Sequence, residues 1–306
     1  MAKDTAFQVS KNKSNTLKGI AMLMIVFVHC LNEYGVFHSD LSELLLIPDY
    51  GSLGCSLFFL LSGYGMWLSC SKKGKTDVPY LYRHLKKLIV PFLVAFVIAM
   101  AVLAVRHKSI DAVNVLTLNM PNGIDLWFFK MVFVNYVIVS LLFMRRIDDR
   151  KRIVVLGGLY VVLIPTLYYL HFANYWYLSI MQFPIGAAMA YDNRWIPKKN
   201  LWACVGVSLF AACYLARQMH VSIPVLIMEN TCFAVSMMTL IRHTSRLLEY
   251  IGKNSLYFYL FGIPVMMAID SGGMHWSIYL GLNLLFSIVA VTLFTSVVHR
   301  ETESSR

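Results

Sequence analysis

The sequence predicts an all-α membrane protein, a bundle of about ten transmembrane helices with its N- and C-termini in the cytoplasm. Three observations predict this fold class. Of the 306 residues, 58% are hydrophobic and only 14% are charged, and the mean hydropathy is +0.62. Apolar segments long enough to cross a bilayer recur along the chain. The basic residues alternate between the loops that join these segments.

Ten apolar segments have roughly the 17–25 residues that a helix needs to cross about 30 Å of hydrocarbon. In chain order they are 17–34, 51–70, 79–105, 125–144, 153–171, 176–192, 201–217, 222–241, 254–270 and 277–298. Only a short break, His171 to Tyr175, separates the fifth from the sixth. No A-x-A-like cleavage site follows the first span, so we expect it to be retained. The chain is therefore predicted to be one transmembrane domain, 1–306, embedded over 17–298, with cytoplasmic tails 1–16 and 299–306.

The basic residues predict the orientation. With the N-terminus in the cytoplasm, all but four of the 27 Lys and Arg residues fall on the cytoplasmic side. The four exceptions are Arg106, Lys108, Lys130 and Arg217. The first outer loop carries Asp40, Glu43 and Asp49 and no basic residue. Because the bias alternates at every loop, it supports the number of spans as well as their direction.

Composition also excludes several functions. The net charge of +11 falls in short blocks between apolar runs. This pattern is typical of a surface that faces anionic lipid, so we expect a bilayer partner and no nucleic acid. The six cysteines show neither a CxxC pair nor metal-ligand spacing, and we expect no metal. No P-loop or GxGxxG motif is present, and we expect no permanently bound cofactor. The loops are too short for a soluble domain, so any chemistry belongs to the bundle or its edge.

The first span carries the strongest candidate for chemistry, His29. An ionisable group at membrane depth costs several kcal/mol unless it is paired or hydrated, so it is a candidate functional residue. Lys18 precedes His29 by eleven residues, which places both on one helix face, roughly 16 Å apart. Glu33 follows one turn later. The alternative is a histidine satisfied by a backbone carbonyl, with Lys18 as an interfacial anchor.

Glu229, in the eighth span, is the second candidate. Helix rise places it about 10 Å below the outer surface and His29 about 12 Å below it, in a core about 30 Å thick. Two ionisable groups at similar depth can meet across a bundle. We therefore hypothesise that Glu229 orients the His29 imidazole and stabilises its protonated form. Glu33, four residues after His29, competes for this role.

The third candidate is a basic block where the third span leaves the cytoplasm. Arg83, Lys86 and Lys87 share one helix face. One interpretation is anchoring by the positive-inside rule. The other is a phosphate-binding mouth for a nucleotide-bearing donor.

Five short motifs occur in order along nearly the whole chain. They are Lys18-x10-His29, the run FFLLSGYG at 58–65, the run YRHLKK at 82–87 followed by Pro91, the run LWFF at 126–129, and the run IGKNSLYFYL at 251–260. Together they resemble the acyltransferase-3 family of integral-membrane O-acyltransferases. Two positions depart from the family pattern. Lys86 replaces the usual second arginine of the basic motif and loses bidentate phosphate geometry. Gly262 stands where a histidine often follows the fifth motif.

The resemblance implies transfer of an acyl group, most often acetyl, from cytoplasmic acyl-CoA to a hydroxyl group. The acceptor would be a sugar, a polysaccharide or a related cell-envelope molecule, and the protein would be a multi-pass component of the plasma (inner) membrane. Acyl-CoA is then a co-substrate. The implied general base is His29, and Glu229, a candidate from its depth alone, is the second catalytic residue. The implied donor-binding residues are Lys18, Ser62, Gly63, Arg83, Lys86 and Lys87. The implied acceptor-binding residues are Glu33 and Trp127.

Other interpretations stay open at this point. The small residues Ser62 and Gly63 leave room for the pantetheine arm or simply let helices pack closely. A covalent acyl-histidine relay is a variant of the mechanism. A transporter or flippase of lipid-linked sugars would use His29 and Glu229 as a proton relay, with prolines breaking helices around its site. A scaffold subunit without activity would need neither His29 nor the basic block.

Overall fold

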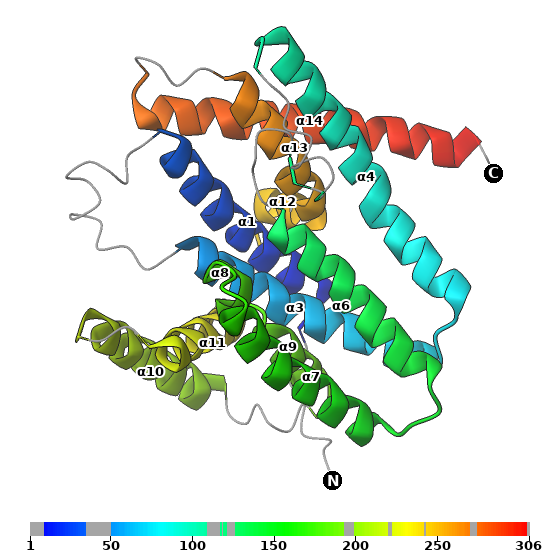
Figure 1. Cartoon of the computed structure of the whole chain (residues 1–306), viewed down its shortest axis with the longest axis vertical. Coiled ribbons are helices and arrows are strands. Elements are labelled where there is room, and N and C mark those ends of the chain that lie inside the picture. Colours follow the sequence, from blue (N-terminus) through cyan, green and yellow to red (C-terminus); the bar gives the residue numbers. More distant parts are fainter. Residues whose placement is uncertain are drawn as a thin grey trace. The chain divides into compact units, whose positions relative to one another are not determined.

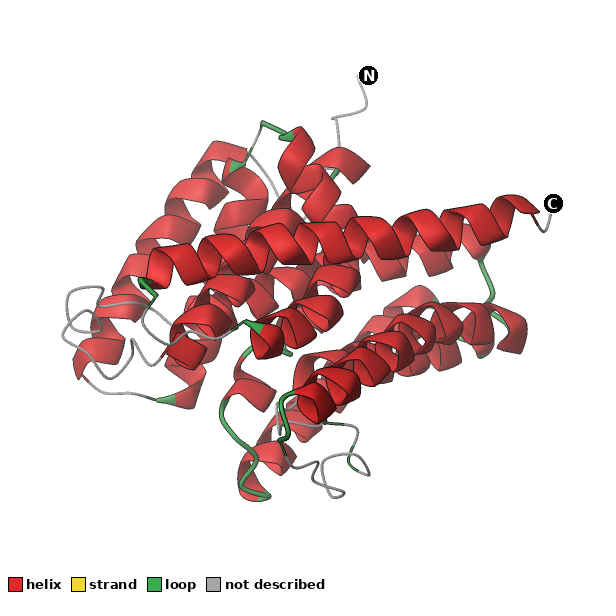
Figure 2. Ribbon diagram, turned by 90° about the horizontal axis from the view of Figure 1, so that it is seen from above, coloured by secondary structure: helices red, strands yellow, loops and turns green. Residues whose placement is uncertain are grey.

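The structure of the protein is a computed structural model that describes residues 9–34, 50–108, 117, 119–120, 126–192, 199–219, 222–241, 243–269 and 274–304. Within these residues every regular element is a helix, and none is a strand (Figure 2). This confirms the predicted all-α class. It follows from the composition, because a helix satisfies all its backbone hydrogen bonds within one segment, as an apolar environment requires.

The helices follow one another with short connections. In chain order they are α1 (Lys11–Tyr34), α3 (Tyr50–Lys73), α4 (Val78–Val105), α6 (Trp127–Met144), α7 (Asp149–Tyr169), α8 (Tyr175–Leu178), α9 (Gln182–Tyr191), α10 (Lys199–Met219), α11 (Ile223–Leu240), α12 (Arg246–Lys253), α13 (Ser255–Ala268) and α14 (Trp276–Ser304). Among the described residues, seven helices are long and apolar enough to cross a membrane: α1, α3, α4, α6, α7, α11 and α14. The chain is therefore a multi-pass membrane protein.

Of the remaining three predicted spans, 201–217 lies within α10, which has 21 residues, and the other two fall on an interrupted and a shorter helix. The span predicted at 176–192 corresponds to two helices, α8 and α9, because the helix is interrupted at residues 179–181. Pro184 lacks an N–H, so it cannot bond the Ile180 carbonyl one turn earlier, and the Phe183 N–H bonds that carbonyl instead at 3.1 Å. The span at 254–270 corresponds to α13, which has only 14 residues. The count of ten spans and the cytoplasmic termini stay predictions.

Helices continue into both of the predicted tails. Helix α1 begins at Lys11, inside the tail predicted at 1–16, and α14 continues to Ser304 beyond the predicted end at 298. The sequence around both ends is polar but helix-compatible, so hydropathy marks where the apolar stretch ends rather than where the helix does.

Helix α7 shows how local sequence defines an element. The Asp148 carboxylate accepts a hydrogen bond from the Lys151 N–H at 2.8 Å and so caps the first turn. At the other end, His171 adopts φ 57°, and the Phe172 N–H bonds the Leu167 carbonyl at 3.0 Å. This is a Schellman ending, with histidine in the left-handed position that glycine most often takes.

The contacts divide the chain into two compact units. Unit 1 comprises Met1–Met24, Pro48–Leu85 and Trp127–Lys253, and unit 2 comprises Ile25–Ile47, Lys86–Leu126 and Asn254–Arg306. The boundary between Met24 and Ile25 falls within α1, and the boundary between Leu85 and Lys86 falls within α4. The two units therefore share helices and are not successive segments of the sequence.

Unit 1 is centred on α3, which packs most extensively against α9 and also contacts α6 and α11 (Figure 1). Helix α10 packs on α11, and α7 packs on α9. Close approach of α3 and α9 depends on two glycines. A Cβ on Gly63 would overlap the Phe183 carbonyl, and a Cβ on Gly186 would overlap the Leu60 carbonyl. These contacts place α3 at the centre of the unit.

Unit 2 is built on the pair α13 and α14. The buried stripe of α14 consists of Tyr279, Asn283, Ser287 and Val291, one residue per turn. Phe294 of α14 packs on Phe261 of α13, with ring centroids 4.8 Å apart. The C-terminal half of α1 belongs to the same unit. Its Cys30 sulfur lies 3.9 Å from the Met266 sulfur of α13.

Candidate active site

The predicted Lys18–His29 stripe lies on the buried face of α1. Met22 and Ile25 occupy the same face between the two ionisable residues, and their exposed fractions are 1% and 2%. Lys18 and His29 are both partly buried. The stripe therefore faces protein rather than lipid, which is the arrangement expected of intramembrane ionisable groups with a function.

Glu229 is buried in α11, with an exposed fraction of 2%. Its carboxyl group interacts electrostatically with the side chain of Cys213 on α10. One turn further along the same helix pair, Phe233 packs on Phe210, with centroids 5.8 Å apart. Glu229 thus lies at the contact of α11 with α10, inside unit 1.

The neighbour of Glu229, Asn230, holds three helices together. Its amide donates to the Ser52 hydroxyl of α3 at 2.9 Å and to the Leu178 carbonyl, at the end of α8, at 3.2 Å. The Ser179 hydroxyl donates to the Ser52 carbonyl at 3.0 Å. All three polar residues are buried. Asn230 therefore satisfies a carbonyl that the α8–α9 break exposes, and it fixes the rotation of α11 that carries Glu229.

Sequence reasoning did not single out this network. The available signal was a second polar residue directly after Glu229 in an apolar span, together with Ser179 shortly before Pro184. Polar side chains near a proline inside a membrane helix are typical partners of the backbone groups that the proline leaves free.

The small-residue motif of α3 has two different faces. Gly63 is buried and lies against the backbone of α9, where the Ala187 nitrogen would be 3.2 Å from an added Cβ. Gly65 is exposed, and nothing lies within 4 Å of an added Cβ there. Ser62 is partly buried. The absent side chain at Gly63 thus serves helix packing, and the role of Ser62 and Gly63 in donor binding stays a prediction.

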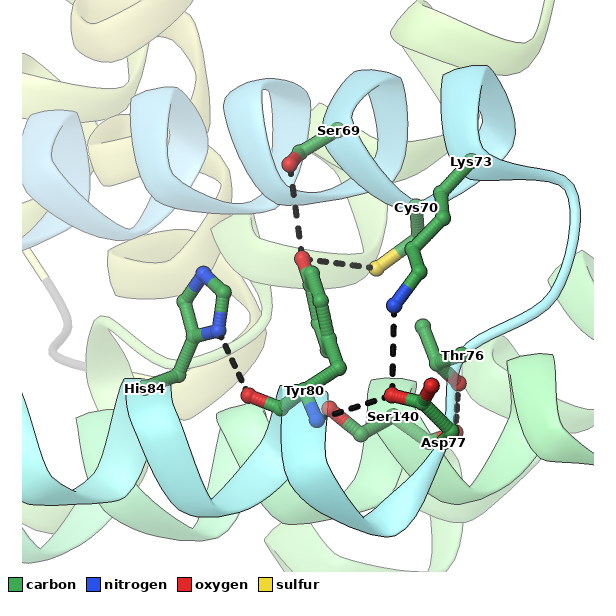
Figure 3. Close-up of polar contacts among 8 residues, drawn as sticks. All are labelled: Ser69, Cys70, Lys73, Thr76, Asp77, Tyr80, His84 and Ser140. Atoms are coloured by element: carbon green, nitrogen blue, oxygen red, sulfur yellow. Dashed lines mark hydrogen bonds and ion pairs between the residues drawn. The ribbon is translucent and has the colours of Figure 1, made fainter.

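The predicted cationic mouth lies at the start of α4. Arg83, Lys86 and Lys87 are all exposed on this helix. Next to them, the end of α3 and the start of α4 are joined by a polar cluster around Tyr80, which Figure 3 shows. The Tyr80 hydroxyl lies 3.3 Å from the Ser69 hydroxyl and 3.6 Å from the Cys70 sulfur. This cluster sets the direction in which α4 leaves the α3–α4 turn.

His84 extends this cluster by one turn. Its Nδ1 lies 2.8 Å from the Tyr80 carbonyl (Figure 3). Its ring is stacked on Tyr136 of α6, with centroids 5.7 Å apart. His84 is the immediate neighbour of Arg83. His84 was visible in the sequence as part of the basic motif. Its contact with Tyr136 was not predictable, because Tyr136 belongs to a different helix.

Asp77 caps the first turn of α4. Its carboxylate accepts a hydrogen bond from the Tyr80 N–H at 2.8 Å and an ion pair from Lys73 at 3.1 Å. The Tyr80 backbone bond, and after it the Lys73 contact, hold the pKa of Asp77 below its ordinary value. The turn that precedes the cationic mouth is therefore fixed by an ionised aspartate.

Trp127, the first residue of α6, stands in an aromatic cluster. Its ring centroid lies 5.6 Å from Tyr175 and 6.3 Å from Trp176, both on α8. The Lys130 ammonium lies 5.6 Å from the Trp176 ring centroid. Trp127, Lys130 and both α8 rings are partly buried. The role of Trp127 in acceptor binding stays a prediction, and the cluster supplies a rigid aromatic surface for it.

The site residues divide between the two units. Unit 1 contains Lys18, Ser62, Gly63, Arg83, Trp127 and Glu229, whereas unit 2 contains His29, Glu33, Lys86 and Lys87. The pairing of His29 with Glu229 accordingly stays a prediction. The competing partner, Glu33, lies on α1, but its side chain is outside the described residues.

The fold and the α1 stripe define a multi-pass membrane protein with ionisable side chains on the buried face of its first helix. Comparison with known proteins specifies the class further. The family model described as an acyltransferase domain matches residues 12–300, and the chain belongs to the acyltransferase-3 family. Neither the curated proteins nor the solved structures contain a match to the chain. Family membership indicates a membrane acyltransferase.

Proposed function

We propose that this protein is a membrane O-acyltransferase that moves an acyl group, with acetyl as the proposed group, from cytoplasmic acyl-CoA to a hydroxyl group. The acceptor is a sugar, polysaccharide or related cell-envelope molecule, and the enzyme resides in the plasma (inner) membrane. One observation carries the proposal beyond the family match. Lys18 and His29 lie on the buried face of α1, with Met22 and Ile25 between them.

In the proposed mechanism, His29 acts as general base. The neutral imidazole takes the proton of the acceptor hydroxyl while its oxygen attacks the thioester carbon. The carbon–sulfur bond then breaks, the new carbon–oxygen ester bond remains, and the proton passes from the imidazolium to the CoA thiolate. Glu229 is proposed to stabilise the imidazolium that forms between these steps. The net reaction converts acyl-CoA and an alcohol into an ester and CoA.

The donor is proposed to bind from the cytoplasmic side. Its phosphates carry negative charge that matches Lys18, Arg83, Lys86 and Lys87. The Asp77 cap and the His84 stack support this part of the proposal, because they hold the start of α4 in one orientation. The pantetheine arm is proposed to pass Ser62, and the acceptor to enter near Trp127 and Glu33.

Acyl transfer by purified protein in proteoliposomes tests the proposal, with acetyl-CoA labelled in its acetyl group as the probe. Release of free CoA and appearance of labelled ester or acetate are both measured. His29→Ala is expected to lower turnover by a factor on the order of 10²–10⁴, the usual contribution of a general base. His243→Ala, at an exposed histidine, is the matched control and is expected to retain turnover.

Two outcomes would contradict the proposal. Normal turnover by His29→Ala would remove His29 as the base. If the wild-type protein moved lipid-linked sugar across the bilayer without releasing CoA, it would be a transporter.

Comparing Glu229→Gln with Glu33→Gln assigns the partner of His29, since only the substitution of the partner should lower turnover strongly. Surface-glycan composition of wild-type and deletion strains identifies the acceptor.

A further inference from the structure

Beyond the proposed acyl transfer, unit 1 carries an exposed cationic surface at the α6–α7 turn. We define this surface, the α6–α7 cationic surface, by five exposed residues: Lys72, Lys75, Arg145, Arg146 and Arg150. Lys72 and Lys75 lie at the α3–α4 turn, and the three arginines lie at the α6–α7 turn.

Thr76 joins these two turns. Its hydroxyl donates to the Ser140 carbonyl at 2.7 Å, as Figure 3 shows, and its N–H donates to the Phe143 carbonyl at 3.4 Å. Thr76 is buried, with an exposed fraction of 1%. The lysines at the α3–α4 turn and the arginines at the α6–α7 turn therefore belong to a single surface.

The carboxylates of the same region already have basic partners. Asp77 pairs with Lys73 at 3.1 Å, Asp148 pairs with Lys151 at 3.7 Å, and Asp149 pairs with Arg152. Within the described part of the chain, no ion pair joins a carboxylate to any of the five residues of the α6–α7 cationic surface. The surface therefore presents uncompensated positive charge and complements an anion.

Arg152 stabilises the backbone at the end of α6, next to Arg145 and Arg146. This residue is only 9% exposed. Its guanidinium donates to the Leu142 carbonyl at 3.3 Å and to the Arg145 carbonyl at 3.1 Å, and it lies 4.4 Å from the Phe143 ring centroid. The bonds fix the last turn of α6, so Arg145 and Arg146 project from an ordered turn.

Apolar side chains continue the surface toward the centre of the spans. Leu141 lies one turn before Arg145 on α6, and Val154 lies one turn after Arg150 on α7. Their exposed fractions are 50% and 66%, which is typical of lipid-facing residues. On both helices the same face thus carries a cation at its end and an exposed apolar residue one turn further in.

We propose that the α6–α7 cationic surface is a binding site for an anionic phospholipid of the surrounding membrane. Arg145, Arg146 and Arg150 contact the phosphodiester headgroup, assisted by Lys72 and Lys75, and an acyl chain lies along Leu141 and Val154. A lipid fits better than a soluble phosphate compound, because the cations lie at the ends of three helices long enough to span a membrane and border their apolar faces.

Native mass spectrometry of the detergent-solubilised full-length chain tests this site. Phosphatidylglycerol and phosphatidylcholine are titrated separately, and the bound lipid is counted. We expect phosphatidylglycerol to bind at least about tenfold more tightly. The variant R145Q/R146Q/R150Q should lose on the order of a hundredfold of this affinity, since each of the three surface cations contributes roughly fivefold. R145K/R146K/R150K keeps the charge and should bind within about threefold of wild type.

The control variant K11Q/R246Q/K253Q removes the same number of exposed charges elsewhere in unit 1 and should retain the affinity. Glycerophosphoglycerol, the headgroup without acyl chains, should not displace the lipid at a tenfold excess. Equal binding of both lipids would overturn the proposal, as would equal losses in the control and the arginine variant. Displacement by glycerophosphoglycerol would assign the surface to soluble phosphates instead. If R145Q/R146Q/R150Q fails to fold, R145K/R146K/R150K still tests the proposal, because it keeps the charge and has its own expected affinity.

Discussion

Gly63 of α3 lies directly against the Phe183 carbonyl of α9, and Gly186 of α9 lies against the Leu60 carbonyl of α3. The two contacts are reciprocal, so each helix supplies a glycine where the backbone of the other approaches. Membrane helices associate through such close contacts because lipid provides no hydrophobic driving force between them. The position of α3, which also carries Ser62, depends on this crossing.

Alanine at either glycine should therefore destabilise the protein. We expect Gly63→Ala and Gly186→Ala each to cost about 1–3 kcal/mol, because α3 and α9 must separate to admit the new methyl group. Thermal unfolding in detergent measures this cost. Gly65→Ala is the matched control, since nothing lies within 4 Å of a Cβ there. Equal melting temperatures for Gly63→Ala and Gly65→Ala would contradict the observed crossing.

The Asn230 network offers a second prediction about stability. Asn230→Ala leaves the Leu178 carbonyl without its amide donor and removes the bond to Ser52, and it should cost about 0.5–2 kcal/mol. In a double-mutant cycle, Asn230→Ala and Ser52→Ala should be non-additive, because they remove one shared hydrogen bond. Ser208→Ala, at an exposed position of α10, should change little. Strict additivity of the two substitutions would argue against the shared bond.

Asp77 predicts a pH dependence of stability. Its pKa in the folded protein lies below the ordinary value, so its contribution is present above the unfolded-state pKa of about 3.9. The contribution is lost as pH falls through the lower folded-state pKa. Asp77→Asn should therefore melt at a lower temperature than wild type near neutral pH. The difference in melting temperature between Asp77→Asn and wild type should narrow as the pH falls. A difference that stays constant down to about pH 3 would contradict the role of Asp77 as an ionised cap.

Donor binding should depend on charge at the start of α4. On the proposed function, Arg83→Gln should raise the KM for acyl-CoA several-fold, up to about tenfold, with little change in kcat. Raising the salt concentration should likewise raise the KM of the wild-type protein for acyl-CoA. Lys86→Arg should lower the KM, because arginine restores bidentate phosphate geometry. Lys108→Gln serves as the control. A loss of kcat at unchanged KM would place Arg83 outside the donor site.

Several of the structural features were predictable from individual stretches of sequence. Apolar length located α1, α3, α4, α6, α7, α11 and α14, and eleven-residue spacing placed Lys18 and His29 on one face of α1. The break between α8 and α9 was missed, because Pro184 within an apolar run is compatible with either a kink or an interruption. Asn230 was missed because its partners, Ser52 and Leu178, come from distant segments.

The sequence by itself determined the helical class, the membrane environment and the family, since these depend on local hydropathy and on motifs read along one chain. The tertiary structure decided which side chains meet. It placed Gly63 in a helix crossing, buried the stripe through Met22 and Ile25, stacked His84 on Tyr136, and joined the α3–α4 turn to α6 through Thr76. Such contacts depend on the rotation and crossing of helices distant in sequence, which periodicity within one helix does not specify.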